Sequence, residues 1–174
     1  MNEILQRATK VKLLLMDCDG VMTDGRIFVL EAGDDQKAFY VRDGLGIELF
    51  HRAGLKTGVI TGRNSIALER RAQGLGMSFL WQGNENKREA FQRTLVESGL
   101  AGDEVAFIGD DLSDIPLMKL CGFAIAVSNA AEETKAVAHY VTEAKGGRGA
   151  VREVCELILK AQDKWADIVA SYNE

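Results

Sequence analysis

The sequence VKLLLMDCDGVMTDG, residues 11–25, decides the fold of this chain. Its first six residues form an apolar run with a single lysine, which is typical of a β-strand buried on both faces. The run ends at two aspartates, Asp17 and Asp19, followed by glycines and polar residues. In an open α/β sheet, ligands bind beyond the carboxyl ends of the strands, so this stretch predicts a functional site at its aspartates.

The rest of the chain alternates between short apolar runs and amphipathic stretches. Further strands are expected at residues 57–60, 78–81, 105–108, 123–127 and 139–142, and helices at residues 45–53, 65–75, 87–98, 115–120, 130–137 and 150–169. This alternation predicts an α/β fold, a Rossmann-like parallel sheet with helices on both faces. The chain has 174 residues and no linker, repeat or low-complexity tract, so we expect a single domain over residues 1–174 that ends in a helix and tail at about 150–174.

One segment departs from the alternation. Residues 26–30 and 36–41 are rich in β-forming residues, and the five residues between them have the composition of a turn. This pattern predicts a β-hairpin over about residues 26–41, directly after the first strand. Its apolar side chains are Ile27, Val29, Phe39 and Val41. A hairpin with these side chains is too apolar to stand in water unprotected.

The charge balance excludes some classes of partner. Lys and Arg number 21 and Asp and Glu number 26, a net charge of −5, which argues against wholesale binding to nucleic acid or to an anionic membrane. The three cysteines, Cys18, Cys121 and Cys155, lack metal-ligand spacing, so we expect thiols in a reducing compartment. Residues 1–10 lack the apolar stretch of a secretory signal, and no apolar run approaches ~18 residues. A cytoplasmic protein is therefore expected.

Chemically suggestive residues follow three of the predicted strands. They are Asp17 and Asp19 after the first, Thr61-Gly62-Arg63 after the strand ending at residue 60, and Asp110, Asp111 and Asp114 after the strand ending at residue 108. Two acidic clusters at one edge of a sheet repel each other, and a hard divalent cation with oxygen ligands removes that repulsion. Mg²⁺ commonly binds one or two carboxylates together with a substrate phosphate, so the sequence predicts a Mg²⁺ site here.

The remaining residues suit a phosphoryl group. Thr61 and Gly62 offer a hydroxyl and backbone N–H groups near a helix N-terminus, where an anion is favoured. Lys87 begins a later helix and supplies a positive charge. Together with the acidic clusters these residues predict a phosphoryl-transfer site. Asp24 and Asp43, taken singly, are better interpreted as turn or helix-cap residues.

Four segments resemble, in order, the four motifs of the haloacid dehalogenase superfamily of phosphatases: Asp17-x-Asp19-Gly20-Val21-x-Thr23-Asp24-Gly25, Ile60-Thr61-Gly62-Arg63, Lys87, and Gly109-Asp110-Asp111-x-x-Asp114. The resemblance extends over about residues 10–160. Residues 37–47 and 146–154 are similar to members that act on 3-deoxy-D-manno-octulosonate 8-phosphate in lipopolysaccharide precursor biosynthesis. The resemblance therefore implies a Mg²⁺-dependent phosphatase of that sugar acid.

The resemblance also implies roles for individual residues. Asp17 is implied as the nucleophile that forms an aspartyl-phosphate, and Asp19 as the acid that protonates the leaving alcohol and then activates water. Lys87 and Thr61, with Gly62, are implied to bind the phosphoryl oxygens.

For the metal, the implied ligands are the Asp17 carboxylate, the backbone carbonyl of Asp19 and the Asp110 carboxylate. Asp111 and Asp114 are placed outside this set, orienting metal-bound water or Lys87.

Family members with a roofing cap domain insert it in one of two intervals, which here span only 44 residues from Asp17 to Thr61 and 26 residues from Thr61 to Lys87. We therefore expect no cap domain. The resemblance and the apolar hairpin together imply a homotetramer, with hairpins at its centre and neighbouring subunits completing each active site.

Three arginines are candidates for the substrate. Arg63 follows the Thr-Gly pair and Arg71 lies two turns further along the same helix, and the resemblance favours both for the substrate carboxylate. Arg148 lies in a Gly-Gly-Arg-Gly loop that is mobile by composition, and it either closes over a neighbour's substrate or faces solvent.

Three other functions are open. One is a phosphatase of a nine-carbon sugar acid 9-phosphate, and another is a non-catalytic relative. The third is a signalling receiver domain, which also uses aspartates, a threonine and a lysine. The order of residues argues against the receiver, because here the acidic trio follows Lys87 instead of preceding the acceptor Asp17.

Overall fold

The computed structural model describes residues 3–31, 35–83 and 86–173 of the chain. Its main feature is a six-stranded parallel sheet. In spatial order the strands are β5 (Phe79–Trp81), β4 (Lys56–Ile60), β1 (Leu13–Met16), β6 (Val105–Gly109), β7 (Phe123–Ala126) and β8 (Tyr140–Val141). All six strands expected from the sequence are confirmed, since a buried parallel strand has a local apolar signature.

Strand β1 occupies the centre of the sheet, between β4 and β6. Its four residues are fully buried, and Leu13 is in register with Lys56 on one side and Val105 on the other. The chain extends the sheet from β1 toward β5 and then crosses back to β6. The order of strands therefore reverses at β1, and ligands in such sheets bind at the carboxyl end of this switch point.

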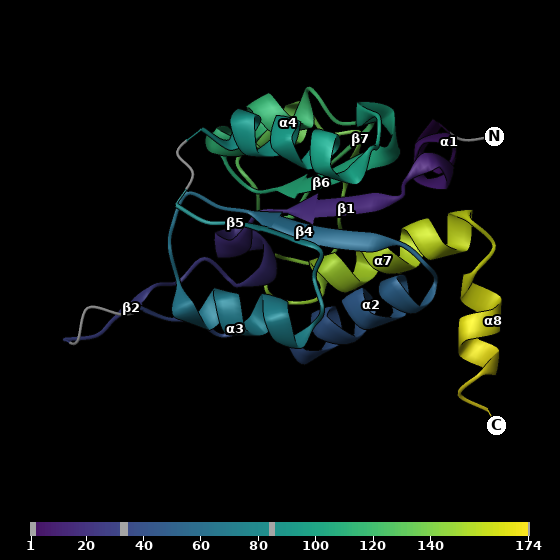
Figure 1. Cartoon of the computed structure of the whole chain (residues 1–174), viewed down its shortest axis with the longest axis horizontal. Helices are drawn as coiled ribbons and strands as arrows, with labels where there is room; N and C mark the ends of the chain where they lie inside the picture. Colours follow the sequence, from purple (N-terminus) through teal and green to yellow (C-terminus); the bar gives the residue numbers. More distant parts are fainter. Residues whose placement is uncertain (1–2, 32–34, 84–85, 174) are drawn as a thin grey trace.

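Helices cover both faces of the sheet (Figure 1). Helices α2 (Val41–Arg52), α3 (Ile66–Gly74) and α7 (Ala150–Ala161) lie on one face, and α4 (Lys87–Ser98) lies on the other with α5 (Ile115–Met118) packed against it. The remaining short elements are α6 (Glu132–Ala136) and the helical turns η1 (Cys18–Met22), η2 (Gly102–Glu104) and η3 (Leu112–Asp114). This arrangement confirms the Rossmann-like α/β fold, and the intervals between Asp17, Thr61 and Lys87 hold no cap domain within the described residues.

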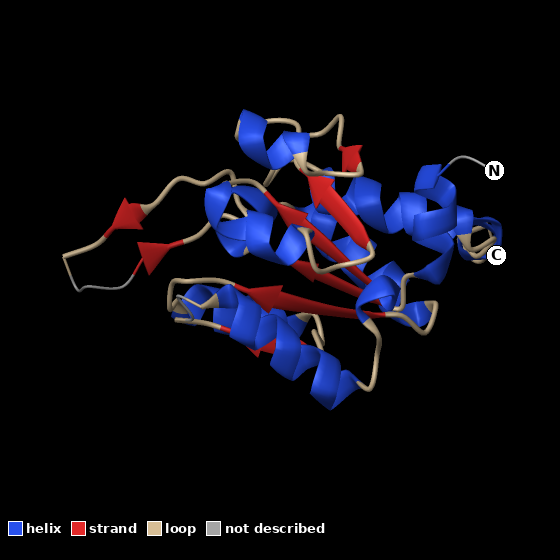
Figure 2. Cartoon of the chain, turned by 90° about the horizontal axis from the view of Figure 1, so that it is seen from above, coloured by secondary structure: helices blue, strands red, loops and turns tan. Residues whose placement is uncertain are grey.

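The hairpin is shorter than expected. Strands β2 (Phe28–Val29) and β3 (Asp35–Gln36) pair antiparallel and extend away from the body (Figure 2), while the turn residues 32–34 lie outside the described part. Residues 36–41 do not form one strand, because Val41 already begins α2. Of the apolar residues expected on the hairpin, Ile27 and Val29 are exposed, whereas Phe39 packs partly on the core.

Helix α2 begins at Val41, four residues before the expected start. Asp43, Gly46 and Ile47 are buried, and the first two lie against Arg152 of α7, which packs closely against α2. The contact between these two helices outweighs the local preference of Val41 for a strand.

The expectation of one long C-terminal helix over residues 150–169 is wrong. It is two helices, α7 and α8 (Trp165–Ala170), separated at Asp163, whose φ is 57°. The side-chain amide of Gln162 donates to the backbone carbonyls of Ala8 and Val11 at 3.2 and 2.7 Å. The ammonium of Lys164 donates to the Ala53 carbonyl at 3.0 Å. These contacts with distant parts of the chain direct residues 162–164 away from the α7 axis.

Helix α1 (Glu3–Lys10) was not expected, because this segment is polar and buries only one residue completely, Ala8. Within the described ranges, none of the helices is both long enough and apolar enough to cross a membrane.

Candidate active site

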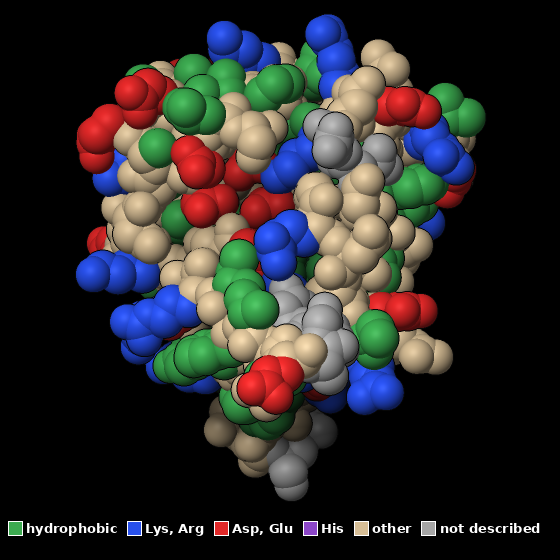
Figure 3. Space-filling view, turned by 90° about the vertical axis from the view of Figure 1, so that its left-hand side faces the viewer, with side chains coloured by type: hydrophobic (Ala, Val, Ile, Leu, Met, Phe, Trp, Pro, Cys, Tyr) green, Lys and Arg blue, Asp and Glu red, His purple; other side chains and the backbone are tan. Residues whose placement is uncertain are grey.

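The candidate site lies at the carboxyl ends of β1, β4 and β6. Asp17 follows β1, Thr61 follows β4 and Asp110 follows β6, so three neighbouring strands bring these residues to one edge of the sheet. Seen from this end in Figure 3, acidic side chains gather near the middle of the face and basic side chains border them. The structure thus brings together residues that the sequence analysis expected at one edge of the sheet.

The turn η1 brings Asp17 and Asp19 to the same place. Its backbone leaves helical geometry at Asp19 (φ −79°, ψ 114°) and at Gly20 (φ 96°), and the hydroxyl of Thr23 accepts the N–H of Gly20 at 3.4 Å. A Cβ at position 20 would overlap the carboxylate of Asp110. Glycine is therefore required at position 20, both for the positive φ and for the close approach of Asp110.

Three carboxylates meet beside this turn. Oxygen atoms of Asp17, Asp110 and Asp114 all lie within 4.8 Å of one another. The ammonium of Lys87, at the start of α4, donates to Oδ1 of Asp17 at 2.8 Å and to Oδ1 of Asp114 at 2.7 Å. Four charged groups from three separate parts of the chain thus form one cluster.

Asp114 is occupied by contacts within the protein. Its side chain has no exposed surface, Oδ1 binds Lys87, and Oδ2 accepts the backbone N–H groups of Asp110 and Asp111 at 2.9 and 3.3 Å. Asp111 is exposed, and its Oδ1 accepts the N–H of Leu112 at 2.8 Å. These contacts suit the supporting positions expected for both residues.

The cluster is electrostatically unfavourable for its carboxylates. Burial, followed by the charge of Asp114, raises the pKa of Asp17 to about 6 even though Lys87 opposes the shift. Burial raises the pKa of Asp110 to about 8, and the charges of Asp114 and Asp17 add to this effect. Burial lowers the pKa of Lys87, but Asp17 and Asp114 together reverse this, so it lies above its ordinary value.

A divalent cation fits this donor set. Asp17 and Asp110 present hard oxygen ligands, and the pKa of each carboxyl is raised by burial and then by the neighbouring carboxylates, whose charge one lysine does not neutralise. The turn residue Gly20, next to the expected carbonyl ligand of Asp19, lies against Asp110. The residues present therefore fit the expected Mg²⁺ site.

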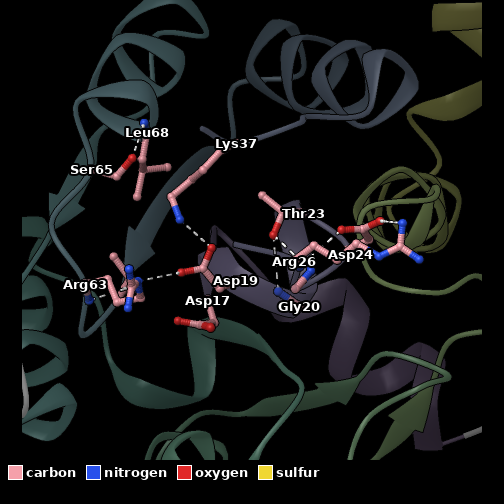
Figure 4. Close-up of polar contacts among 12 residues, drawn as sticks. Asp17, Asp19, Gly20, Thr23, Asp24, Arg26, Lys37, Arg63, Ser65 and Leu68 are labelled. Atoms are coloured by element: carbon pink, nitrogen blue, oxygen red, sulfur yellow. Dashed lines mark hydrogen bonds and ion pairs between the residues drawn. The ribbon is translucent and has the colours of Figure 1, made fainter. Parts of the chain in front are cut away.

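Asp19 lies at the rim of the cluster, in contact with two cations (Figure 4). Its Oδ1 is 2.5 Å from Nζ of Lys37, and its Oδ2 is 3.7 Å from Nε of Arg63. Lys37, which comes from the segment after β3, was not among the expected site residues. Its place in the motif at residues 37–47 was the only signal, because nothing local shows that the chain passes over the β1 turn.

Thr61 and Gly62 lie between β4 and α3. Thr61 is buried, its N–H donates to the carbonyl of Trp81 at 2.9 Å, and its hydroxyl accepts the N–H of Arg63 at 3.4 Å. Gly62 is exposed. Ser65 caps the N-terminus of α3 by accepting the N–H of Leu68 at 3.3 Å. The backbone between Thr61 and this helix start is thus in place to meet an anion.

Two expected substrate arginines lie elsewhere. The guanidinium of Arg71 lies 5.8 Å from the ring centre of Phe39 and against Gly44 of α2. Arg148 is exposed, with Nη2 3.5 Å from Oδ2 of Asp24. In the ranges that the structure describes, neither arginine forms an ion pair with the carboxylates of the cluster.

The loop that carries Arg148 is packed against the turn η1. The N–H of Gly147 donates to the carbonyl of Val21 at 2.8 Å, and a Cβ at Gly146 would overlap the carbonyl oxygen of Gly20. Gly146 and Gly147 therefore allow the loop to pack closely on η1, whereas its mobility stays a prediction.

Asp24 and Asp43 have the local roles expected of them. Asp24 accepts the N–H of Arg26 at 3.2 Å within the turn. Asp43 accepts the N–H of Arg152 at 2.8 Å and so caps the start of α7 from a different helix.

Surface shape alone does not identify the site. A groove of about 610 Å³ is lined by residues such as Lys12 and Leu55, and another of about 540 Å³ by Arg7 and Gly122. Both lie at the amino ends of the strands, opposite the carboxylate cluster.

Comparison with known proteins agrees with this geometry. The model of the haloacid dehalogenase-like hydrolase family matches residues 71–154. The 3-deoxy-D-manno-octulosonate 8-phosphate phosphatase KdsC of Yersinia pestis is 47% identical over 163 residues, covering 94% of this chain and 87% of that protein. The protein of the same name from Escherichia coli K12 is 43% identical over 162 residues, covering 93% and 86%.

A solved structure extends the comparison. The crystal structure of 3-deoxy-D-manno-octulosonate 8-phosphate phosphatase from Moraxella catarrhalis, in complex with magnesium, phosphate and KDO, has a TM-score of 0.96 and 45% sequence identity. The match covers 99% of this chain and 99% of the Moraxella catarrhalis chain. The chain therefore belongs to the 3-deoxy-D-manno-octulosonate 8-phosphate phosphatase family of haloacid dehalogenase-like hydrolases.

Proposed function

We propose that this protein is a Mg²⁺-dependent phosphatase that hydrolyses 3-deoxy-D-manno-octulosonate 8-phosphate to the free sugar acid and inorganic phosphate. The observation that carries the proposal is the contact of Lys87 with Asp17 inside the carboxylate cluster, two residues from Asp19. The proposed nucleophile Asp17, the proposed acid Asp19 and the ammonium of Lys87, which binds phosphate, thus lie together. The names of the relatives support this substrate, and lipopolysaccharide precursor biosynthesis is the proposed pathway.

The chemistry proceeds in two displacements. In the first, a carboxylate oxygen of Asp17 bonds to phosphorus, the bond from phosphorus to the sugar oxygen breaks, and Asp19 gives its proton to that oxygen. In the second, Asp19 takes a proton from water, the water oxygen bonds to phosphorus, and the bond between phosphorus and Asp17 breaks. Asp19 ends the cycle protonated and Asp17 ends it as a free carboxylate, so the protons balance.

The other residues bind and orient. Lys87 holds Asp17 in its ionised form and meets the phosphoryl oxygens, and Thr61 and Gly62 bind the same group through a hydroxyl and backbone N–H groups. Asp114 fixes the position of the Lys87 ammonium. Mg²⁺, held by Asp17, Asp110 and the Asp19 carbonyl, supplies positive charge against the phosphoryl oxygens when bound.

Arg63 is the best-placed of the three arginines for the substrate carboxylate. Its guanidinium is half-exposed and reaches Asp19, at the rim where the sugar part of a bound substrate emerges. Arg148 lies on the other side of the η1 turn, where it contacts Asp24. Arg71 would have to give up its contact with the ring of Phe39 before it could reach the substrate. Arg63→Ala should raise KM far more for the sugar-acid phosphate than for an aryl phosphate, and equal effects would mean that Arg63 reads phosphate only.

The active unit is a homotetramer in which hairpins meet and neighbouring subunits complete each site. Supporting this, four consecutive apolar side chains of the hairpin are exposed, Val29 to 84%. Burying such a patch between subunits removes a large unfavourable contact with water. The cytoplasm is the proposed compartment, and the three free cysteines agree with a reducing environment.

The deciding experiment is a screen of phosphate release. It compares eight- and nine-carbon sugar-acid phosphates with ordinary hexose phosphates, with and without Mg²⁺, and uses Asp17→Asn as the inactive control. Hydrolysis of the eight-carbon substrate only with Mg²⁺ and only by the unaltered protein supports the proposal. A preference for the nine-carbon substrate, or full activity of Asp17→Asn, would overturn it.

A further inference from the structure

Lys37 is a buried lysine whose place in the molecule the chemistry described so far does not explain. Its side chain is only 2% exposed, and Nζ lies 2.5 Å from Oδ1 of Asp19. Burying an ammonium group is costly unless it is paired, and a charge-assisted contact of this length is among the stronger kinds of hydrogen bond. The contact is therefore specific, and it joins the segment after β3 to the turn after β1 (Figure 4).

The two oxygens of Asp19 have different surroundings. Oδ1 is held by Lys37, whereas Oδ2 is buried and accepts no hydrogen bond from the residues in the described ranges. Nε of Arg63 lies 3.7 Å from Oδ2, which is too far for a hydrogen bond. One oxygen is thus anchored, and the other has no hydrogen-bond partner among the described residues.

This anchoring fixes the direction of the carboxylate. The backbone at Asp19 is set by the η1 turn, but the side chain still has staggered alternatives about its first torsion. Lys37 selects among them by binding Oδ1, because Arg63, 51% exposed, offers a looser competing contact. Catalysis by a proton donor depends on its position within a fraction of an ångström, so this selection bears on rate.

We propose that Lys37 is a positioning residue for the acid of this enzyme: it holds Oδ1 of Asp19 so that Oδ2 is the atom that exchanges the proton with the sugar oxygen and then with water. The proton moves from Oδ2 to the leaving oxygen as the phosphorus–oxygen bond breaks, and water returns a proton to Oδ2 in the second displacement. This inference rests on the proposed function through the role of Asp19, but not on which sugar acid is the substrate.

The test uses leaving groups that differ in their need for a proton. An alkoxide needs protonation as it departs, whereas 4-nitrophenolate does not, so loss of a positioned acid slows alkyl phosphates more than aryl phosphates. The value of kcat/KM covers the steps up to departure of the leaving group and excludes the second displacement, which both kinds of substrate share. It is measured for the sugar-acid phosphate, for glycerol phosphate, which has no carboxylate, and for 4-nitrophenyl phosphate.

Lys37→Met keeps the length of the side chain and removes its charge. We expect kcat/KM to fall about 10- to 100-fold for both alkyl phosphates and less than about 3-fold for the aryl phosphate. Lys37→Arg restores a cation and should recover part of the loss on the alkyl phosphates alone. The control is Lys12→Met, which breaks a 2.6 Å ion pair with Glu104 at an exposed position away from the site and should change none of the three values.

Two outcomes would overturn the inference. Equal losses of kcat/KM on all three substrates would show that Lys37 only maintains the fold. The thermal unfolding of each variant is therefore measured beside the kinetics. A loss confined to the sugar-acid phosphate would show that Lys37 binds the substrate carboxylate instead. Failure of the proposed function is separate, because it appears as inactivity of the unaltered protein on the sugar-acid phosphate while the comparison of glycerol phosphate with the aryl phosphate still stands.

Discussion

The ammonium of Lys87 lies 2.7 Å from Oδ1 of Asp114, a carboxylate with no exposed surface. Asp114→Ala leaves Lys87 paired with Asp17, but it removes the acceptor of two backbone N–H groups, those of Asp110 and Asp111. A buried donor without an acceptor costs about 1–3 kcal/mol, so the free energy of unfolding should fall by about that amount, measured by urea denaturation. Glu132→Ala is the control, because Glu132 pairs with Lys135 at a similar 2.8 Å but is 86% exposed, so the loss should stay below about 1 kcal/mol. Similar losses in both variants would contradict the buried pairing.

Mg²⁺ binding should strengthen as the pH rises. The pKa values of Asp17 and Asp110 are raised to about 6 and about 8, and a carboxylate must lose its proton to bind a metal. Affinity should therefore increase from about pH 6 to above pH 8, with release of protons, as measured by titration calorimetry in buffers of different ionisation enthalpy. Asp110→Asn should abolish binding and the rise in Tm that Mg²⁺ produces. An affinity independent of pH would contradict this prediction.

Gly20→Ala should damage the metal site as well as the fold. Both Gly20 and Gly54 have a positive φ, 96° and 81°, but a Cβ at Gly20 would overlap Asp110 whereas one at Gly54 meets no atom within 4 Å. In Gly54→Ala the free energy of unfolding should fall only by the cost of the left-handed conformation, about 1–2 kcal/mol, and the activity should be kept. Gly20→Ala should also lose Mg²⁺ affinity and phosphate release. Unchanged Mg²⁺ affinity in Gly20→Ala would disprove the close approach.

Asp43 should make stability depend on pH. Burial raises the pKa of Asp43 above its ordinary value of 3.8, although the N–H groups of Arg152 and Gly149 oppose the shift. The contribution of a carboxyl with a raised pKa in the folded state is complete below the unfolded value and is lost as the pH rises through the folded value. Relative to Asp43→Asn, the unaltered protein should therefore lose stability in urea as the pH rises from about 4 toward neutrality.

The same helix cap gives a second measure of Asp43. Asp43→Ala removes the acceptor for α7 altogether and should cost about 0.5–2 kcal/mol near pH 4 and less as the pH rises. The difference in the free energy of unfolding between the unaltered protein and Asp43→Asn should change with pH in the stated direction. If it stays constant or changes in the opposite direction, the carboxyl is not buried in the way described.

The hairpin should control the assembly. Val29 is 84% exposed on the hairpin and Val96 is 83% exposed on α4, so the two valines are matched in exposure but not in place. Val29→Glu should reduce the mass measured by light scattering from that of a tetramer, while Val96→Glu leaves it unchanged. A monomeric unaltered protein with full activity would refute the assembly.

The sheet and most of its functional edge could be predicted from the sequence. The apolar run before Asp17 has a local signature, and the rule that parallel strands end at one edge brings Asp17, Thr61 and Asp110 together without knowledge of the helices. Lys87 also follows from its place after a strand and loop. Such residues are predictable because each depends on its own strand.

Other features depend on contacts between distant segments. Lys37 meets Asp19 only because the chain returns from the hairpin over the β1 turn, and Asp43 caps a helix 109 residues away. Arg71 was expected at the substrate, but Phe39 and Gly44 hold it against α2. The break between α7 and α8 follows from the bonds of Gln162 with Val11 and Ala8. None of these has a local pattern, so propensity and spacing do not reveal them.

The packing of Gly146 on Gly20 has a consequence for motion during catalysis. Because the loop backbone lies directly on the carbonyl of Gly20 and the N–H of Gly147 is bonded to Val21, a displacement of this loop away from η1 has to break that contact. A loop movement that admits a sugar phosphate would therefore carry this cost, unlike a rotation of the exposed Arg148 side chain about its own torsions.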